Sequence, residues 1–410
     1  MDFEQHYTAE QEAFRQEVRA WLDAEIPAGF EATVPFDVQR QSEAQFLWGK
    51  AFRRKLGERG WLAPTWPPQF GGGGLTVAHQ VVIEEELAPH NLPFCGDLGI
   101  TLAAPALMAW GTDEQKQRFI APMLKGEVIT WQLFTEPEAG SDLASLKSRA
   151  VPDGDDYVLN GQKIFVGHTW YAEWLYVLAV TEPEGPRHHN ISAFIVPSNL
   201  PGITIEPLKL LGGMGKKTVY FENVRVPKSA LVGEEKGRGK GWWVAQTTLE
   251  LEHGADGRVL PREPLVDDLI GYCRDTQRFG HAISSEAEVQ DILTEVHIRS
   301  HVGRLLGWRN HWMQSTGQHF TYQGSQFSLW GKTFNPWLVE QTQHILGPYA
   351  GTDDEQWGPL RGAIENHQRQ GIITHPGGTP EIQRVIIARA LSLSRSPNRT
   401  AQTGRGRGAE

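Results

Sequence analysis

The sequence predicts a multidomain α+β protein in which helices come first, a small β domain follows and helices return. Three observations support this prediction. Apolar residues recur at helical spacing through residues 1–129, short β-rich runs fill 130–236, and helical patterns resume over 237–395. We take these three ranges as domains. The last segment, 396–410, contains too few apolar residues to fold, and we expect it to be disordered.

The amino-terminal domain is predicted to be helical from near its start. Thr8 and Gln11 have the spacing of a capping box, and apolar residues then recur at helical spacing until Pro27 ends the run. Four further helical patterns follow, at 41–59, 76–88, 99–110 and 113–125. Between the first two, WLAPTWPPQFGGGG at 61–74 is too rich in proline and glycine for regular structure, and its aromatic residues favour a packed loop over a flexible linker.

The middle domain contains short runs typical of strands, among them YVLN, WLYVLAV and ISAFIVP, which are separated by turn residues. Helical patterns return at Trp242 and continue to about Ser394. No internal repeat is evident in the sequence. The pattern alone therefore predicts a class of protein, multidomain α+β, and no particular fold.

Composition and charge argue against several classes of function. A net charge of -10 over 410 residues disfavours a nucleic-acid-binding surface, which needs clustered Lys and Arg. Only Cys95 and Cys273 are present, so there is no disulfide framework. The chain opens without a signal-peptide pattern, and no apolar stretch approaches the roughly 20 residues that span a bilayer. We expect a cytoplasmic protein with no membrane segment and no metal site.

Two strings carry most of the functional signal. FTEPEAGSD, at 134–142, brings the hydroxyls of Thr135 and Ser141 and the bare backbone of Gly140 to one short turn. That combination suits a place where main-chain N–H groups must close on a ring edge or a phosphate. NGQKIFVG follows at 160–167. Either string alone could be an ordinary surface loop, because Pro, Gly and Asp are common turn formers.

The order and spacing of further strings strengthen this interpretation. GTDEQKQRF lies at 111–119, VRVPKSALVGEEKGRGKGW at 224–242 and GGTPEIQRVIIARAL at 377–391. Together the strings resemble the acyl-CoA dehydrogenase family, from about Thr8 to about Arg395. The resemblance implies an amino-terminal helical domain, a middle β-barrel domain and a carboxy-terminal helical bundle, with FAD between the last two. It also implies an acyl-CoA substrate, formation of an α,β double bond, and transfer of electrons to an electron-transfer flavoprotein.

The resemblance further implies which residues hold the flavin. Residues of the Thr135 and Ser141 type hydrogen-bond the flavin ring and pyrophosphate, and Phe165 takes the place of an aromatic residue against the ring. Gly167 stands where the family usually has Thr or Ser, so the hydroxyl near the reacting nitrogen is missing. The implied cofactor-binding set is Phe134, Thr135, Gly140, Ser141, Phe165, Val166, Gly167, Thr379 and Glu381.

The family's usual catalytic base, a Glu just before Gly-Thr in the last string, is Gly377 here. The backbone N–H of Gly377 can still donate to the thioester oxygen, because that role needs no side chain. Thr379 and Pro380 have the pattern of an N-cap and a first-turn proline, so the final helix could point its positive end at the pyrophosphate. A capped helix with no ligand explains these two residues equally well.

A minority branch of the family carries its base on a helix beside the flavin, in a stretch resembling Leu-Asp-Leu-Glu-Arg. Residues 249–253, LELEH, match that stretch and place Glu252 at the base. A helical wheel puts Ala245 close to Glu252 on a mostly apolar face, so we expect a raised pKa that suits a general base. The alternative is an ordinary solvated helical Glu. The implied substrate-binding set is Ser141, Glu250, His253 and Gly377, with His253 replacing the branch's Arg.

Moving the base to a helix and placing glycines at 377 and 378 leaves space for a bulky or branched acyl group. The branch includes dehydrogenases that act on steroid side-chain thioesters. Equally, the glycines could serve only a tight turn. Alternatives to a bulky-substrate dehydrogenase are a non-catalytic subunit of a heteromeric dehydrogenase and a flavin oxidase of the same fold.

Two departures from the family pattern concern assembly. The family's Arg before Phe-Gly, which reaches a neighbouring subunit's flavin, falls on Thr276, although Arg274 and Arg278 are nearby. The Gln and paired Gly that also reach across are His344, Gly347 and Pro348 here. We therefore expect a hetero-oligomer of the α2β2 type, in which a paralogous subunit supplies the missing contacts. A homo-oligomer is the alternative.

Overall fold

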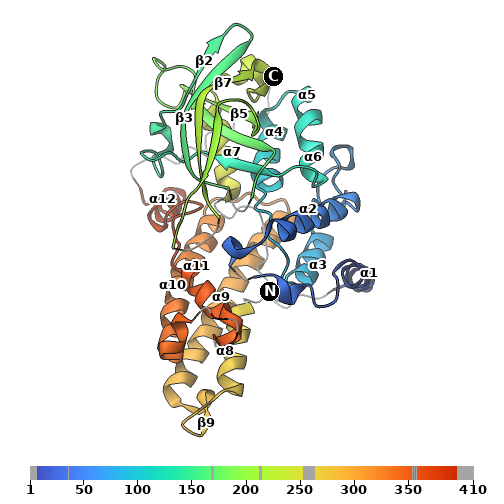
Figure 1. Ribbon diagram of the computed structural model, residues 1–410, viewed down its shortest axis with the longest axis vertical. Helices are drawn as coiled ribbons and strands as arrows, with labels where there is room; N and C mark the ends of the chain where they lie inside the picture. The colour runs from blue at the N-terminus through green and yellow to red at the C-terminus, as the bar shows by residue number, and fades with distance from the viewer. Residues whose placement is uncertain are drawn as a thin grey trace. The chain divides into compact units, whose positions relative to one another are not determined.

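The computed structural model describes residues 7–35, 37–167, 170–211, 215–252, 264–352, 354, 356 and 358–394 (Figure 1). The chain divides into two compact units. One extends to Leu251 and contains the first helices, the sheet and α7 (Gly241–Glu250), and the other begins at Glu252 and is helical. The predicted order of helices, strands and helices is confirmed. The predicted domain limits at 129, 236 and 395 stay predictions, and the predicted disordered tail, 396–410, lies outside the described residues.

The first unit opens with helices close to the predicted ranges. They are α1 (Ala9–Glu25), α2 (Glu43–Glu58), α3 (Val77–Leu87), α4 (Ala104–Trp110), α5 (Asp113–Gln115) and α6 (Ala121–Leu124). The capping box is confirmed, because Thr8 accepts from the amide of Gln11 and the side chain of Gln11 accepts from the amide of Thr8. Trp61 and Phe70 are buried, so the proline-rich segment is a packed loop, as predicted.

Two of the predicted helices contain a π-helical stretch, at Gly99–Ala103 and Lys116–Ile120. Pro105 and Pro122 each follow one of these stretches after a single alanine. Proline has no N–H to donate and its ring clashes with the carbonyl group four residues before it, so the helix widens in the preceding turn. The apolar periodicity predicted the helices but not this local widening.

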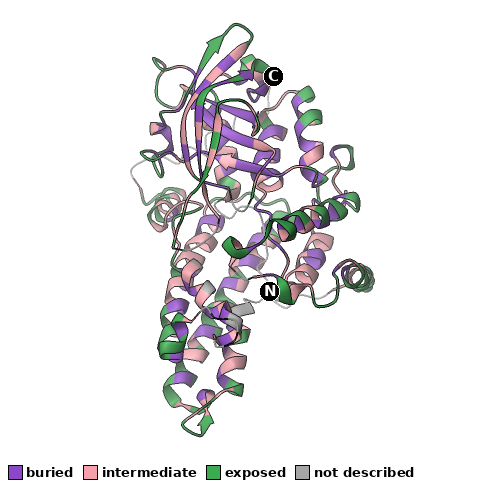
Figure 2. Ribbon diagram, viewed as in Figure 1, coloured by how far each residue is buried: buried purple, intermediate pink, exposed green. Residues whose placement is uncertain are grey.

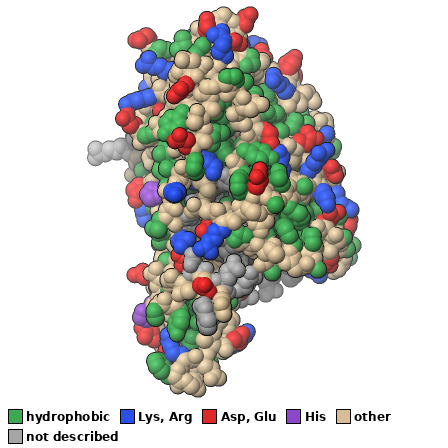
Figure 3. All heavy atoms as spheres, in the orientation of Figure 1, with side chains coloured by type: hydrophobic (Ala, Val, Ile, Leu, Met, Phe, Trp, Pro, Cys, Tyr) green, Lys and Arg blue, Asp and Glu red, His purple; other side chains and the backbone are tan. Residues whose placement is uncertain are grey.

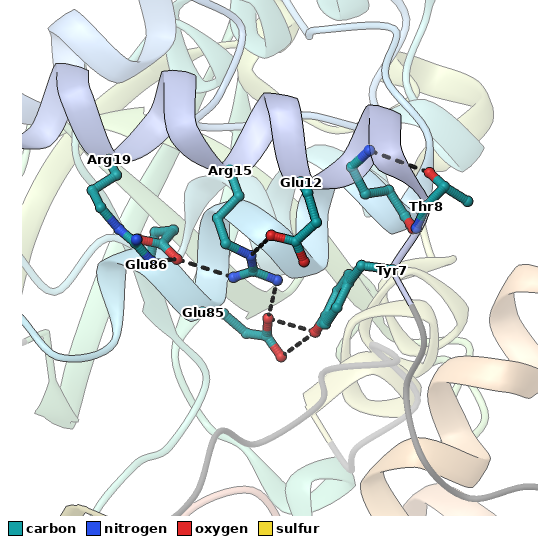
Figure 4. A network of polar contacts seen from close by, with 8 residues as sticks. Tyr7, Thr8, Glu12, Arg15, Arg19, Glu85 and Glu86 are labelled. Carbon is teal, nitrogen blue, oxygen red and sulfur yellow. Dashed lines mark hydrogen bonds and ion pairs between the residues drawn. The ribbon is translucent and has the colours of Figure 1, made fainter.

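Polar contacts join α1 to α3 (Figure 4). The guanidinium group of Arg15 contacts Glu85 at 2.8 Å and Glu86 at 3.0 Å, and Arg19 contacts Glu86 at 2.9 Å. The hydroxyl of Tyr7 donates to Glu85 at 2.6 Å, and burial together with this contact raises the pKa of Tyr7. The shared carboxylates fix the crossing of the two helices in a partly buried setting, where such pairs are screened less than on the open surface.

A seven-stranded sheet follows these helices in the first unit, in the order β1-β4-β2-β3-β7-β6, with β5 pairing with β4. The strands are β1 (Thr130–Leu133), β2 (Arg149–Asp153), β3 (Asp156–Val166), β4 (Trp174–Val180), β5 (Ile191–Pro197), β6 (Ile203–Pro207) and β7 (Lys217–Pro227). Strands β1 and β2 pair with β4 in parallel, and the other pairs are antiparallel. Strands β4 and β5 are buried along most of their length, and α7 packs against β5. Figure 2 shows much of the sheet in the colour of buried residues.

The second unit consists mainly of helices, with a short hairpin of β8 (Gln277–Arg278) and β9 (His281–Ala282). The helices are α8 (Pro264–Asp275), α9 (Ala287–Ser315), α10 (Gln323–Leu346), α11 (Ala363–Gly371) and α12 (Pro380–Ala390). Leu269, Val296, Phe334 and Leu338 belong to its core. Helix α10 packs against both α9 and α12, so it supports α12 and the turn that precedes it.

Charged side chains of both signs are interspersed over the face drawn in Figure 3. Among the described residues, none of the helices has the length and apolar character needed to cross a membrane.

Candidate active site

The turn that follows β1 is held from inside by Glu136. The backbone groups of Glu136 and Ala139 bond to each other across the turn, at 3.0 and 3.1 Å. The carboxylate of Glu136 is buried and accepts from the amides of Lys147, at 2.6 Å, and Ser148, at 3.0 Å. A buried carboxylate needs such donors to offset its desolvation. The string at 134–142 therefore has a fixed conformation.

Lys163 ties the second string to the first. Its ammonium group is fully buried and contacts Glu136 at 2.7 Å and the carbonyl oxygen of Phe134 at 3.4 Å. The amide of Ile164 also donates to the carbonyl oxygen of Thr135, at 3.0 Å. Burial lowers the pKa of Lys163 to about 8, although the negative charge of Glu136 acts to raise it. The sequence reading singled out neither member of this pair.

The polar groups predicted to contact a cofactor are available on this turn. Gly140 and Ser141 are exposed and Thr135 is half-buried. Within the part of the chain that the structure describes, the hydroxyls of Thr135 and Ser141 and the amides of Gly140 and Ser141 make no hydrogen bond. A Cβ atom added to Gly140 would meet no atom of the described residues within 4 Å. Phe134 is buried in the core, which leaves only its backbone for a ligand.

The end of β3 is strained where it carries the predicted aromatic contact. The pairing of β3 with β7 shifts register between Lys163 and Val166. Phe165, in the shifted segment, has φ 58°, a conformation that bulky residues rarely adopt, and its side chain is 49% exposed. Val166 is buried in the core, so its side chain faces away from any ligand on the surface. This strain keeps a large aromatic side chain outside the core.

The structure gives a steric reason for a glycine at position 167, which the sequence did not reveal. Gly167 has φ 59°, and a Cβ atom added to it would lie closer than 3.0 Å to the indole of Trp131, which is fully buried in β1. A Thr or Ser at this position would have to displace the indole or the strand. The absence of the hydroxyl is thus coupled to a side chain 36 residues earlier in the sequence.

In the second unit, Glu252 lies next to Gly377. The regular part of α7 ends at Glu250, and Leu251 and Glu252 have π-helical backbone, which a wheel of 3.6 residues per turn does not describe. Glu252 is half-buried. Gly377 has φ 66°, and a Cβ atom added to it would lie 3.2 Å from the carbonyl oxygen of Glu252 and 3.7 Å from its Cγ. The position of the family's usual base and the position of the predicted base are therefore neighbours.

Two side chains that the sequence reading did not identify hold the turn before α12. The ammonium group of Lys332, on α10, donates to the carbonyl oxygens of Thr374, at 3.1 Å, and Pro376. The side-chain amide of Gln383, on α12, donates to the carbonyl oxygen of Gly377 at 2.7 Å, and Gln383 is fully buried. Burial lowers the pKa of Lys332, and the negative charge of Glu252 opposes that shift.

The predicted N-cap of α12 is confirmed. The hydroxyl of Thr379 accepts from the amide of Ile382 at 3.4 Å, and Pro380 is the first helical residue. Glu381 is exposed, and its own backbone N–H and the hydroxyl of Thr379 lower its pKa. The contacts of Thr379 and Glu381 with FAD stay predictions. Glu250 is exposed, and His253 lies outside the described residues, so their contacts with substrate also stay predictions.

Comparison with known proteins identifies the family. Residues 8–127 match the acyl-CoA dehydrogenase N-terminal domain, 132–224 the middle domain and 239–392 the C-terminal domain. The chain belongs to the acyl-CoA dehydrogenase family. The predicted fold class is confirmed, with a helical N-terminal domain, a middle curled-sheet domain and a helical C-terminal domain. The chain is thus an oxidoreductase of a family of FAD-dependent flavoproteins, as predicted.

Several similar proteins are dehydrogenases from mycobacteria. The acyl-CoA dehydrogenase FadE26 of Mycobacterium tuberculosis is 32% identical over 410 residues, covering 95% of this chain and 98% of that protein. Among solved structures, the Tcur3481-Tcur3483 steroid ACAD has a TM-score of 0.81 and 30% identity, covering 97% of this chain and 100% of that one. The ChsE4-ChsE5 complex from Mycobacterium tuberculosis has a TM-score of 0.80 and 30% identity, with the same coverage. The predicted branch is thus represented among the similar proteins.

The residues at 134–142 and 160–167 fit FAD. A flavin needs donors for its ring edge and pyrophosphate, and this chain offers hydroxyls and amides that are unbonded within its described part. It also needs an apolar surface for the ring, and Phe165 is held outside the core by an unfavourable backbone conformation. The chemistry that FAD supplies is hydride acceptance.

Proposed function

We propose that this chain is an FAD-dependent acyl-CoA dehydrogenase that forms an α,β double bond in a bulky or branched acyl-CoA, with Glu252 as its general base. The observation that carries the proposal is the contact between Gly377 and Glu252. Where the family usually has a Glu, this chain has no side chain, and the backbone carbonyl and Cγ of Glu252 lie within 4 Å of that position. The similarity to a solved structure named as a steroid ACAD supports the bulky substrate.

In this proposal, Glu252 removes the proton from the α carbon of the thioester. Removal is favoured when the charge that develops on the thioester oxygen is stabilised, and the N–H of Gly377 donates to that oxygen. FAD, when bound, would supply the acceptor for the hydride that leaves the β carbon. Ser141, Glu250 and His253 contact the substrate.

The FAD contacts divide by chemistry. Thr135, Gly140 and Ser141 would hold the ring edge and pyrophosphate through their donor groups, and Phe165 would offer its side chain to the ring. The backbones of Phe134, Val166 and Gly167 complete that surface, and Thr379 and Glu381 contribute from the start of α12.

Incubation with a panel of thioesters tests the proposal. Octanoyl-CoA, isobutyryl-CoA and cholyl-CoA represent straight, branched and polycyclic acyl groups. The purified flavoprotein should lose its yellow colour under anaerobic conditions with the polycyclic or branched thioester, and more slowly with octanoyl-CoA. Failure of all three thioesters to bleach the flavin would overturn the proposed activity, and fastest bleaching by octanoyl-CoA would overturn the proposed substrate class.

We also propose an α2β2 hetero-oligomer with a paralogous subunit. Arg278, one of the candidates for reaching a neighbouring flavin, is engaged by its own chain, because it contacts both carboxylate oxygens of Glu286 and the carbonyl oxygen of Ile345. His344 contacts Glu288 at 2.9 Å. These residues therefore have structural partners in their own subunit. Arg278 and His344 would have to leave these partners in order to contact a flavin bound to a neighbouring subunit.

A stripe of exposed apolar side chains on α9 supports the same assembly. Ile298, Val302, Leu305 and Trp312 lie within one face of the helix, and each is more than 40% exposed. Expression of the chain alone and with its genomic neighbour, followed by measurement of flavin per subunit, tests the assembly. One full flavin per subunit in the lone homo-oligomer would contradict it.

The electron acceptor in this proposal is an electron-transfer flavoprotein, and the compartment is the cytoplasm. Cys95 and Cys273 are both free thiols, which suits a reducing compartment. Reoxidation of the bleached protein by an added electron-transfer flavoprotein, measured against reoxidation by oxygen, distinguishes a dehydrogenase from an oxidase of the same fold.

A further inference from the structure

The turn at 374–378 has its carbonyl groups bound by side chains from two different helices. Lys332, on α10, binds the carbonyl oxygens of Thr374 and Pro376, and Gln383, on α12, binds that of Gly377 at 2.7 Å, with a longer contact of 3.5 Å to that of Gly378. All of these groups belong to the second unit, and α10 packs against α12. The turn is thus fixed by side chains rather than by backbone pairing.

The bound carbonyl groups determine where the amides point. In a planar trans peptide, the C=O and N–H groups lie on opposite sides. Because the carbonyl of Pro376 faces Lys332, the N–H of Gly377 faces the other way, and because the carbonyl of Gly377 faces Gln383, the N–H of Gly378 faces away from Gln383. Within the described residues, neither N–H group donates a hydrogen bond.

The backbone conformation of the turn depends on this binding. Gly377 and Gly378 have φ of 66° and 77°, a left-handed conformation available to glycine at little cost. Two consecutive glycines leave the chain many other conformations, so the conformation seen here needs external restraints. Lys332 and Gln383 provide them, and Gln383 is fully buried, which limits its own freedom.

We propose that Lys332 and Gln383 are positioning residues that orient the N–H of Gly377 toward the thioester oxygen of the substrate. This inference rests on the proposed function, in which that N–H stabilises the charge on the oxygen. Lys332 has a second effect on the same site, because its charge interacts with that of Glu252. Neither residue touches the reacting atoms, and each acts through the turn.

Substitutions that remove the donors but keep the volume test the inference. Lys332→Met and Gln383→Met each remove one set of hydrogen bonds, and Lys332→Arg keeps donors at the same place. Lys209→Met serves as the matched control, because Lys209 is exposed in the first unit. We expect the rate constant of flavin reduction to fall between about 10-fold and about 100-fold in the two Met variants, with unchanged FAD content. Lys332→Arg should recover most of the rate.

A spectroscopic measurement separates positioning from a purely structural role. The probe is the 2-enoyl-CoA that corresponds to the fastest-bleaching thioester of the panel, labelled with 13C at the thioester carbonyl. A hydrogen bond from Gly377 lowers the stretching frequency of that carbonyl in the bound state. The Met variants should lose most of this shift at saturating ligand and keep the unfolding temperature of the wild type. A full shift in both Met variants would overturn the inference.

Crystal structures of the wild-type protein and the Lys332→Met/Gln383→Met variant give a readout that is independent of activity. We expect the peptide between Pro376 and Gly377 to change orientation in the double variant. An unchanged peptide would overturn the inference even if the protein is an active dehydrogenase. Conversely, a reoriented peptide in a protein that no thioester bleaches would leave the positioning intact and reject the proposed function.

Discussion

Gly167 and Gly377 are both departures from the family's pattern, and the structure gives them different causes. Both have left-handed backbone, with φ of 59° and 66°. At Gly167 the space for a side chain is filled by Trp131, so the lost hydroxyl is excluded sterically. At Gly377 an added Cβ atom would make a tight contact with the carbonyl oxygen of Glu252, at 3.2 Å, and would lie 3.7 Å from its Cγ.

A glycine therefore replaces the family's usual side chain for a different structural reason in each region. In the region around Gly167, a buried ion pair holds the turn after β1, and the buried indole of Trp131 fills the space beside the glycine. In the turn before α12, Gly377 lies beside Glu252, and hydrogen bonds from Lys332 and Gln383 bind the carbonyl groups of the turn. Changes in the first region should therefore affect stability, and changes in the second should affect the rate of the reaction.

The largest effect on stability is expected for Lys163→Met. This change leaves the carboxylate of Glu136 buried without its cation, and breaking a buried pair in this way costs about 3–5 kcal/mol. Urea unfolding followed by tryptophan fluorescence should show the loss, together with weaker retention of FAD. Lys147→Met is the matched control, because Lys147 pairs with Glu138 at the exposed surface of the same turn, and it should leave unfolding unchanged.

Gly167→Ala should have the next largest effect. The added methyl group overlaps the indole of Trp131 and the left-handed backbone is strained, so we expect a loss of about 2–4 kcal/mol. Gly140→Ala is the control, since its added methyl group meets no atom of the chain. That variant should unfold like the wild type while binding FAD less tightly, as isothermal titration of the apoprotein would show. Equal unfolding midpoints for the two variants would contradict the steric explanation of Gly167.

Gly377→Ala should have a smaller effect on stability and a larger one on rate. The left-handed backbone costs about 1–2 kcal/mol for a residue with a Cβ atom. The new methyl group presses on the backbone of Glu252, at 3.2 Å, and shifts its carboxylate. Stopped-flow measurement should show flavin reduction slowed about 10-fold or more. A variant that is destabilised but reacts at the wild-type rate would indicate that this glycine serves the turn alone.

Local patterns in the sequence predicted the elements, because a helix or a strand depends on the spacing of nearby apolar residues. They also predicted the capping box of Thr8 and the N-cap of Thr379. The contacts that fix the two regions could not be predicted in this way. Lys163 meets a carboxylate 27 residues away, and Trp131 and Gly167 meet only because β1 and β3 belong to one sheet.

The signal of the ion pair was nevertheless present in the sequence. Lys163 is the one charged residue of the second string, and the first string holds Glu136, Glu138 and Asp142 as possible partners. The sequence therefore indicates an ion pair between the strings but not which carboxylate forms it. Lys332 and Gln383 carried no comparable signal. Their partners are backbone carbonyl groups, and a sequence does not show which carbonyl groups a tertiary fold will place beside a side chain.

Glu252→Gln tests the central claim most directly. The amide keeps the shape of the side chain but cannot accept the α proton, so anaerobic stopped-flow should show flavin reduction by the best thioester slowed about 100-fold to about 10,000-fold. FAD content and thioester affinity should stay at wild-type values, and Glu340→Gln, an exposed change on α10, should react normally. Flavin reduction at the wild-type rate in Glu252→Gln would contradict the account.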